Sequence, residues 1–573
     1  MRKLFSHLKP YRRECIFGPL FKLAEAGLEL LIPLIVASVI DRGVGGEDRT
    51  HILRMSLSLV GLGLLGLGFS VTAQFFSARA AVGFVTKLRH ALFAHIQRFP
   101  YATLDRIGIP TLITRMSSDM NQVQTGLNLT LRLLLRSPFV VFGAMVMAFT
   151  IDTTAALWFV AAIPVLALVV FGIMLLTMPM YKRVQERLDS VLGTTRENLN
   201  GVRVLRAFRK EEAECAAFAE QNRVLTASQQ RVGKLSALMN PVTYVVVNLA
   251  VIGLIRTGAL RVQAGILTQG AVVALYNYMS QILVELIKLA NLIINITKSL
   301  ACAKRIQSVL DIQDEEKAQQ GLPESDPAVR VEFDHTAIAY GGAGGEALSG
   351  VSLRAMPGQV IGVVGGTGSG KTTLVNLIPR FYEATGGRVL VDGIDVRAWD
   401  PEALRAKIGL VPQKATLFRG NIRENLLWGG EKATDEALLE AVAAAQASDV
   451  VASKGGLDGE IEQFGRNLSG GQRQRLTIAR ALVRKPEILI LDDSASALDF
   501  ATDAALRKAI RSLPYRPTVF LVAQRSTAVS HADQIVVLDE GRVVGLGTHD
   551  ALLDSCPVYR EIHESQFRKE AAQ

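Results

Sequence analysis

Six long apolar segments, arranged as three pairs, constrain the fold of this chain more than any other feature of its sequence. They cover residues 15–40, 53–82, 131–151, 155–178, 238–260 and 271–296, with a short polar turn inside each pair. A helix rising about 1.5 Å per residue crosses an apolar layer of about 30 Å with some 20 residues. One such segment could be a buried helix of a soluble protein, whereas six favour a membrane-embedded helical bundle.

The distribution of charge predicts how this bundle is oriented. Only 20% of the 573 residues are charged, fewer than the quarter that is usual for soluble proteins. Basic residues precede the first segment and fill the two long connections, roughly 87–130 and 182–234, whereas the three short turns contain no Lys. By the positive-inside rule, both termini and both connections are cytoplasmic. We therefore predict a multi-pass protein of the inner, cytoplasmic membrane.

The chain changes character after residue 310. Residues 311–328 are polar and contain Gly321, Pro323 and Pro327, which is typical of a linker. From residue 329 to 573, short β-branched runs alternate with helical patterns, as in an α/β domain with a mainly parallel sheet. The predicted domains are therefore a transmembrane domain (1–310), a linker (311–328) and a soluble domain (329–573). The four cysteines form no CxxC pair, so neither a disulfide framework nor a zinc site is expected.

A glycine-rich loop carries the chemistry of the soluble domain. It fills the interval between an apolar strand-like run, 360–364, and a helical run that begins at Thr373. In the pattern GxxxxGKS/T, backbone amides surround phosphates, the Lys reaches the terminal phosphates and the hydroxyl ligates Mg²⁺. A second apolar strand ends in Asp492, which would hold the same Mg²⁺. We therefore predict that ATP and Mg²⁺ bind at Gly365, Gly366, Thr367, Gly368, Ser369, Gly370, Lys371, Thr372 and Thr373.

A second anion-binding helix start lies between these two motifs. Residues 468–472 read Leu-Ser-Gly-Gly-Gln and open a helical run, so a serine and two glycines stand at a helix N-terminus. Together with the two flanking motifs, this sequence resembles the signature of ABC ATPases. Gln413 then resembles the family's Q-loop glutamine, and Tyr340 the aromatic residue that stacks on adenine. The preceding six segments are similar to the exporter half-transporters of this family.

The resemblance implies a dimer as the working unit. In this family each ATP lies between the Walker motifs of one half and the signature of the other. Ser469, Gly470, Gly471 and Gln472 would therefore serve the nucleotide of a second half-transporter, while Thr372, Gln413 and Asp492 would hold Mg²⁺. The long connections would carry coupling segments near residues 99–105 and 208–214.

Two residues depart from the family's pattern. Asp493 stands where exporters have a catalytic glutamate, and Gln524 where they have a switch histidine. Aspartate is one methylene shorter, and misplacing a general base by about 1 Å can cost on the order of 10²-fold in rate. The chain thus resembles the degenerate-site subunit of a heterodimeric bacterial multidrug exporter, paired with an unlike half that has the Glu and the His. The alternative is that Asp493 is a working substitute in a homodimer.

Polar residues on the sixth segment indicate a transport path. Asn277, Gln281 and Glu285 repeat every four residues, continue through Lys288, and so share one helix face. A polar face in a membrane helix lines a water-filled cavity or packs against neighbouring helices, and both readings stay open. Glu25 and Glu29 on the first segment are one turn apart and join this candidate path.

The predicted function is ATP-driven export of an amphipathic substrate, such as a drug, lipid or peptide. Three alternatives belong to the same class: a homodimeric exporter, an exporter dedicated to one lipid or peptide, and an importer with the exporter fold. A soluble ABC ATPase acting on nucleic acid is disfavoured by the six apolar segments, so no nucleic-acid partner is expected.

Overall fold

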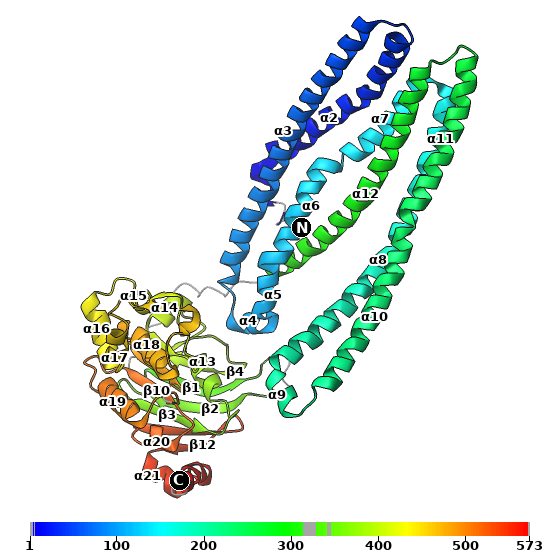
Figure 1. Cartoon of the computed structure of the whole chain (residues 1–573). Coiled ribbons are helices and arrows are strands. Elements are labelled where there is room, and N and C mark those ends of the chain that lie inside the picture. The colour runs from blue at the N-terminus through cyan, green and yellow to red at the C-terminus, as the bar shows by residue number, and fades with distance from the viewer. Residues whose placement is uncertain (1–3, 5, 313–327, 341–344, 495, 571–573) are drawn as a thin grey trace. The chain divides into compact units, whose positions relative to one another are not determined.

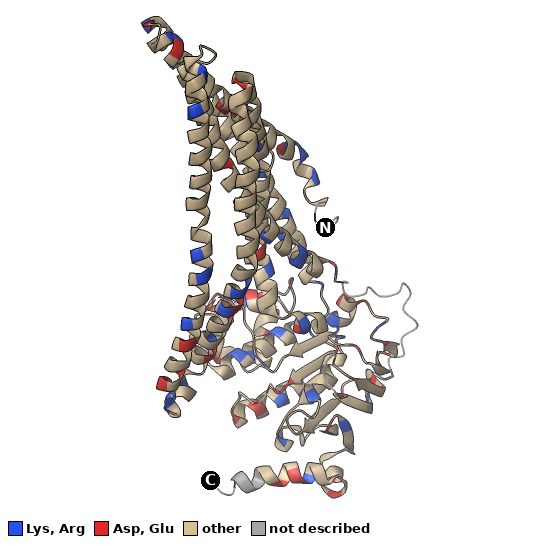
Figure 2. Cartoon of the chain, turned by 90° about the vertical axis from the view of Figure 1, so that its right-hand side faces the viewer, with Lys and Arg blue, Asp and Glu red and all other residues tan. Residues whose placement is uncertain are grey.

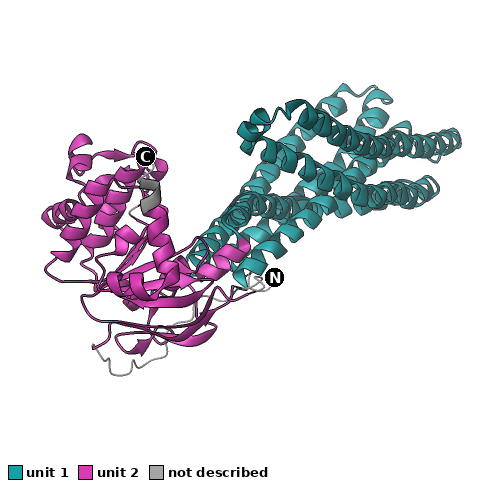
Figure 3. Ribbon diagram, turned by 90° about the horizontal axis from the view of Figure 1, so that it is seen from below, with its two compact units in different colours: residues 1–98, 108–312 teal, residues 99–107, 313–573 magenta. Residues whose placement is uncertain are grey.

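The structure is a computed structural model that describes residues 4, 6–312, 328–340, 345–494 and 496–570. It separates into two compact units, which Figure 3 distinguishes by colour. The first comprises Met1–Arg98 and Gly108–Ile312, and the second Phe99–Ile107 and Gln313–Gln573. Residues 313–327 of the predicted linker lie outside the described residues.

The first unit is built from long helices (Figure 1). Among the described residues, six helical stretches are long and apolar enough to cross a membrane, which agrees with the six predicted segments. In chain order they consist of α2 (Arg12–Ser38), α3 (Arg49–Ile96), α5 (Ile109–Thr114) with α6 (Met120–Leu133) and α7 (Arg136–Ile151), α8 (Thr153–Asn200), α10 (Glu211–Ala237) with α11 (Met239–Gln263), and α12 (Gln269–Leu310). The short α9 (Val202–Ala207) joins α8 to α10.

The short polar turns end one helix and start the next. Asp48 accepts from the backbone N–H groups of Thr50 and His51 at the start of α3, and Asp152 accepts from the Ala155 N–H at 2.7 Å at the start of α8. Such caps satisfy amide groups that a helix start leaves without partners. With 48 residues, α8 is roughly 72 Å long at about 1.5 Å per residue, far longer than an apolar layer requires. In Figure 2 the ribbon segments coloured for Lys, Arg, Asp and Glu are sparse along the middle of the long helices and more frequent toward their lower ends.

Helix α12 is the central element of the first unit. It packs against α2, α6, α7, α8 and α11. Small residues such as Ala26, Ala144 and Ala274 are fully buried at these interfaces, whereas Leu57 and Leu168 expose 71% and 76% of their surface. Small residues inside and large apolar residues outside are the arrangement expected of helices that face lipid.

The described residues of the second unit form three sheets. The larger has the order β12-β11-β3-β10-β9-β6 and is parallel except for the β11–β12 pair. The smaller is antiparallel with the order β2-β1-β4-β5, and a two-stranded β7–β8 sheet stands apart. The strands are β1 (Val331–Ile338), β2 (Leu348–Ala355), β3 (Val360–Gly365), β4 (Gly386–Val391), β5 (Ile394–Asp395), β6 (Ile408–Val411), β7 (Gly420–Asn421), β8 (Glu460–Ile461), β9 (Ile488–Asp492), β10 (Thr518–Val522), β11 (Gln534–Asp539) and β12 (Arg542–Gly547).

Helices cover the larger sheet, whose inner strands β3, β9 and β10 are buried on both faces. Val363 of β3 belongs to the core shared with the smaller sheet, while Val364 belongs to the core under the helices. This explains why the strand sequences are continuously apolar rather than alternating. The helices of this unit are α4 (Tyr101–Ile107), α13 (Lys371–Leu377), α14 (Pro401–Ala406), α15 (Ile422–Leu427), α16 (Asp435–Ala444), α17 (Ser448–Ser453), α18 (Gly470–Val483), α19 (Phe500–Arg511), α20 (Ser526–Val529), α21 (His549–Ser555) and α22 (Pro557–Glu570).

The strand order positions the candidate site. Because β10 lies between β3 and β9, and β6 lies beside β9, the carboxyl ends of these four parallel strands meet at one edge of the sheet. Ligands of open α/β sheets bind at this edge. The glycine-rich loop, Gln413, Asp492 and Gln524 all follow directly from these strand ends or lie on them.

Candidate functional site

Most of the predicted nucleotide residues line one cavity of about 370 Å³. It lies at the carboxyl edge of the larger sheet, and two further residues, Ala347 and Val522, line it as well. Gly365, Gly366 and Ser369 belong to the same loop but are not among the lining residues. The predicted residues that line the cavity are Tyr340, Thr367, Gly368, Gly370, Lys371, Thr372, Thr373, Gln413, Asp492, Asp493 and Gln524.

The glycine-rich loop requires glycine for steric reasons. Gly370 has φ +97°, a conformation that L side chains rarely adopt, and a Cβ there would lie 2.8 Å from the Ala347 carbonyl oxygen. A Cβ on Gly365 would lie 2.1 Å from the carbonyl oxygen of Leu538 on the neighbouring strand β11. The backbone can therefore close around a phosphate only because these positions carry no side chain.

Lys371 is the first residue of helix α13, and its side chain folds back against the glycine-rich loop. Its Nζ donates to the carbonyl oxygens of Gly366 at 2.6 Å and Gly365 at 3.0 Å. Burial lowers its pKa from the usual lysine value, against the attraction of the carboxylates of Asp493 and Asp492. An incoming phosphate would offer this ammonium group a stronger, charged acceptor than two carbonyls.

The chemistry of the donor set fits Mg²⁺. The Thr372 hydroxyl donates to Asp492 Oδ1 at 3.1 Å, and the Gln413 amide lines the same cavity. Hydroxyl, carboxylate and amide oxygens are hard ligands of the kind Mg²⁺ prefers. Burial raises the pKa of Asp492, and its neighbour Asp493 raises it further, so a bound cation would relieve both effects. These residues would hold the ion, which would neutralise charge on the phosphates.

The two residues that depart from the family's pattern contact each other. Gln524 Nε2 donates to Asp493 Oδ2 at 3.0 Å, and Gln413 Nε2 donates to the same oxygen at 3.4 Å. Asp493 also adopts a positive φ of 47°, which aspartate tolerates better than most residues. One oxygen of this carboxylate thus accepts from two side-chain amides.

Tyr340 borders the cavity and has a neighbour that the sequence did not indicate. Its hydroxyl donates to Thr373 Oγ1 at 3.1 Å, and its ring meets that of Tyr382 edge to face with centroids 5.1 Å apart. The Tyr382 hydroxyl in turn donates to Asp105 of α4 at 2.5 Å. Residues 99–107 therefore pack on the rest of the second unit, in the region where the first coupling segment was predicted.

The signature residues lie outside the cavity. Ser469 caps α18: its Oγ accepts from the Gln472 N–H at 3.3 Å, and its own N–H donates to Gln472 Oε1 at 2.9 Å. Gly470 and Gly471 form the first turn of that helix. That these residues serve a second nucleotide stays a prediction.

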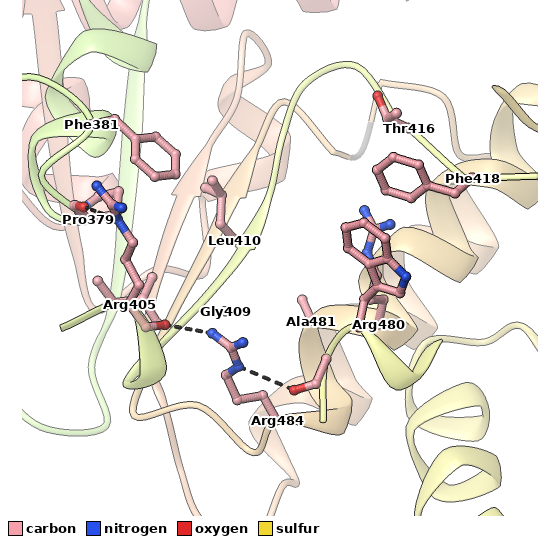
Figure 4. A pocket seen from close by; sticks show the side chains of 13 residues that line it. Pro379, Phe381, Arg405, Gly409, Leu410, Thr416, Phe418, Arg480, Ala481 and Arg484 are labelled. Carbon is pink, nitrogen blue, oxygen red and sulfur yellow. Dashed lines mark hydrogen bonds between the residues drawn. The ribbon is translucent and has the colours of Figure 1, made fainter. Parts of the chain in front are cut away.

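A second cavity of about 330 Å³ lies elsewhere on this unit (Figure 4). The rings of Phe418 and Trp428 stack on one side with centroids 4.1 Å apart, and Phe381 lines it too. Arg480 also lines it; burial lowers the pKa of its guanidinium, whose Nη1 has no hydrogen-bond partner within the described part of the chain. Tyr101 of α4 stacks on Phe381 with centroids 4.1 Å apart, so the cavity borders the predicted coupling segment.

The predicted transport path contains an ionic network that the sequence analysis did not foresee. Arg136 of α7 is buried and donates to Glu285 Oε1 at 2.6 Å and to Glu29 Oε2 at 2.5 Å. Glu285 also accepts from Ser137 and Lys288, each at 2.9 Å. Glu285 thus has the interhelical packing contacts that one of the two readings expected.

The other path residues differ from Glu285 in their surroundings. Glu25 pairs with Lys22 of its own helix at 2.5 Å, and Asn277 is half-buried. Gln281 has a buried Oε1 without a hydrogen-bond partner among the described residues. Contact of these residues with substrate stays a prediction. Arg136 could have indicated the ionic network from the sequence alone, because a charged residue within an apolar membrane segment requires a partner.

Comparisons with known proteins agree with this arrangement. The family model "ABC transporter transmembrane region" matches residues 15–286, and the model "ABC transporter" matches residues 348–496. An uncharacterized ABC transporter ATP-binding protein of Mycobacterium tuberculosis is 36% identical over 98% of this chain and 97% of its own length. An ATP-dependent lipid A-core flippase of Chromobacterium violaceum is 29% identical over 100% of this chain and 98% of its own length.

A solved structure has the same fold. A bacterial Atm1-family ABC exporter with ATP bound superposes with a TM-score of 0.79 at 24% identity, covering 98% of this chain and 99% of that one. The predicted fold class, six apolar helices followed by an ABC ATPase domain, is thereby confirmed.

Proposed function

The chain belongs to the ABC transporter family, and from this premise we propose that it exports an amphipathic substrate as one half of a heterodimer. As a member of this family it is a multi-pass membrane protein that uses ATP for transport. The proposal adds the substrate class, the unlike partner and a slow ATP site on this chain. It places the protein in the cytoplasmic membrane, with the ATPase domain and both termini in the cytoplasm.

The hydrogen bond between Gln524 and Asp493 carries the proposal of a slow site. Asp493 stands where the family has its catalytic glutamate, and the neutral Gln524 amide donates to it at 3.0 Å. Glutamine cannot provide the proton or the charge that a histidine brings to a γ-phosphate. The site would therefore bind MgATP and hydrolyse it slowly, while Ser469, Gly470 and Gly471 complete a faster site with the partner.

A gain-of-function variant tests the slow site directly. The purified full chain, reconstituted in lipid nanodiscs, should show weak ATPase activity. The double substitution Asp493→Glu with Gln524→His should raise kcat at least about 10-fold, because a base displaced by about 1 Å costs up to 10²-fold. Lys371→Ala on the double variant is the matched control and should remove the gain. Robust wild-type turnover that the double substitution leaves unchanged would contradict the proposal.

A partner test separates the heterodimer from a homodimer. Co-expression with the half-transporter encoded nearest to this chain, if that one has Glu after Walker B and a switch His, should give a copurifying pair. The pair should hydrolyse ATP much faster than either chain alone. A homodimer with full, transport-coupled turnover would support the alternative instead.

The substrate proposal rests on the bundle and on one relative. Asn277 and Gln281 are half-buried polar residues of α12, which also buries apolar residues such as Leu275, and this mixture suits a molecule with polar and apolar parts. The flippase relative is named for a lipid, so lipids are the first substrates to test, before drugs and peptides. Stimulation of ATPase activity by lipid A, and ATP-dependent lipid movement in vesicles, would support export. Movement in the opposite direction would favour an importer.

A further inference from the structure

The last described helix, α22, contacts the loop that carries Gln524. Gln566 uses both atoms of its side-chain amide there: its Oε1 accepts from the Ser526 N–H at 2.9 Å, and its Nε2 donates to the Gln524 carbonyl at 3.0 Å. The two bonds enclose Arg525 and fix the backbone on either side of it. A single side chain from a helix 40 residues further along the chain therefore closes this loop.

Two further contacts with α22 involve the side chain of Ser526 in the same loop. Ser526 is fully buried, and its Oγ lies 3.0 Å from His563 Nδ1 and 3.1 Å from Gln566 Oε1. His563 lies one turn before Gln566 on α22, so both side chains reach the loop from one helix face. Loop backbones without such partners are mobile, whereas this one is bonded to a side chain at both ends.

We propose that Gln566 is a positioning residue for the ATP site, acting through Gln524. The Gln524 amide reaches Asp493 at 3.0 Å, and the direction of that side chain depends on the backbone that Gln566 holds. Groups at a reaction centre must be held within about 0.5 Å and 10–20° to work. The inference rests on the proposed function only in taking Asp493 and Gln524 as the site where ATP is hydrolysed.

Hydrogen–deuterium exchange of the full chain tests the contact without requiring any activity. Gln566→Leu keeps the size of the side chain and removes both hydrogen bonds. It should speed exchange of the Ser526 amide about fivefold or more, as loss of one hydrogen bond does. Exchange in strand β10 should not change. Ser565→Ala, which alters an exposed residue on the same helix, is the matched control and should match the wild type. Unchanged exchange at Ser526 in Gln566→Leu would overturn the proposal.

ATPase kinetics distinguish positioning from a general structural role. Gln566→Leu should lower kcat about 10-fold with little change in KM, because it alters the loop of Gln524 and leaves Lys371 and Tyr340, which line the nucleotide cavity, unchanged. Gln566→Glu keeps the acceptor for the Ser526 N–H and loses the donor to the Gln524 carbonyl. Its kcat should therefore lie between those of the wild type and Gln566→Leu. In a Gln524→Ala background, Gln566→Leu should have no further effect on kcat, since residues acting in one pathway are not additive.

Fully additive effects of Gln566→Leu and Gln524→Ala on kcat would overturn the proposal, as would a rise in KM as large as the fall in kcat.

The proposal of a slow site can be wrong while the proposal for Gln566 is right. If the wild-type chain hydrolyses ATP rapidly, that proposal is wrong, yet the ratio of kcat between Gln566→Leu and wild type still decides this one. If turnover is too slow to measure, the exchange of the Ser526 amide decides it.

Discussion

Replacing Arg136 with Leu removes the centre of the ionic network in the helical bundle. The guanidinium joins three helices, since it bonds Glu29 on α2 and Glu285 on α12 from its own position on α7. The leucine is apolar and fits a helix interior, so the substitution removes charge with little change in helix propensity.

The loss of stability in Arg136→Leu depends on the hydrogen-bond partners that Glu285 retains. Its side chain is only 4% exposed, and without Arg136 it still has Lys288 and Ser137, each at 2.9 Å. Removing one partner of a buried pair costs about 3–5 kcal/mol, and the remaining partners place this case near the lower end, about 3 kcal/mol. Glu29 contributes less, because its side chain is 42% exposed.

Thermal unfolding of the purified chain at one fixed scan rate measures this loss. Arg136→Leu should lower the apparent unfolding temperature by roughly 6 °C, from about 2 °C per kcal/mol in a large domain. Arg256→Leu on α11, which removes an exposed arginine, should change it little. The double variant Arg136→Leu with Glu285→Leu should be more stable than Arg136→Leu alone, because replacing both partners by apolar residues avoids an unpaired buried charge.

Two results would refute this reasoning. One is a loss in Arg136→Leu no larger than in Arg256→Leu. The other is a double variant as unstable as the sum of its two single changes. If Glu285→Gln instead reduced substrate stimulation of ATPase and left the unfolding temperature unchanged, Glu285 would be a substrate contact rather than a packing residue.

Three further predictions concern the ATPase unit. In the proposed heterodimer, Ser469→Arg should lower ATP turnover about 10²–10³-fold by removing a proposed donor to the partner's phosphate. Asp493→Asn should cost much less, and equal losses would contradict the proposed slow site. Mg²⁺-dependent ATP binding should weaken as pH falls, and the loss should begin above the usual aspartate range, because the pKa of Asp492 is raised. In Asp493→Asn, which removes the neighbouring charge, a pH titration of ATP binding should show the loss at lower pH. A titration curve that does not shift in this variant would contradict the prediction. Tyr382→Phe removes the hydroxyl that bonds Asp105, so substrate-stimulated ATPase should fall while ATP affinity stays within about twofold; an equal loss of affinity would show a role in binding instead.

The features that could be predicted from the sequence are those determined by residues that follow one another in the chain. The six apolar segments and the strand–loop–helix around Lys371 can be recognised because periodicity and local motifs determine them. That Gln524 faces Asp493 required the strand order, since β9 and β10 are neighbours in the sheet but 31 residues separate the two side chains.

Long-range contacts between unrelated segments were beyond prediction. Tyr382 and Asp105 are separated by 277 residues and Gln566 and Gln524 by 42, and no local pattern links either pair. Arg136 is an intermediate case: its place in an apolar segment requires a partner, but only the packing of α7 against α2 and α12 identifies which one.

The ion pairs around Arg136 join segments that are made at different times during synthesis of the chain. Glu29 leaves the ribosome 107 residues before Arg136, and Glu285 follows 149 residues after it. At about 5–20 residues per second, Glu29 waits roughly 5–20 s for its first partner, and the arginine then waits roughly 7–30 s for Glu285. Glu29 therefore lacks Arg136 while the first hairpin is made, and Arg136 lacks Glu285 when the third segment is made. The ion pairs that join α2, α7 and α12 can therefore be complete only once the sixth segment has been made.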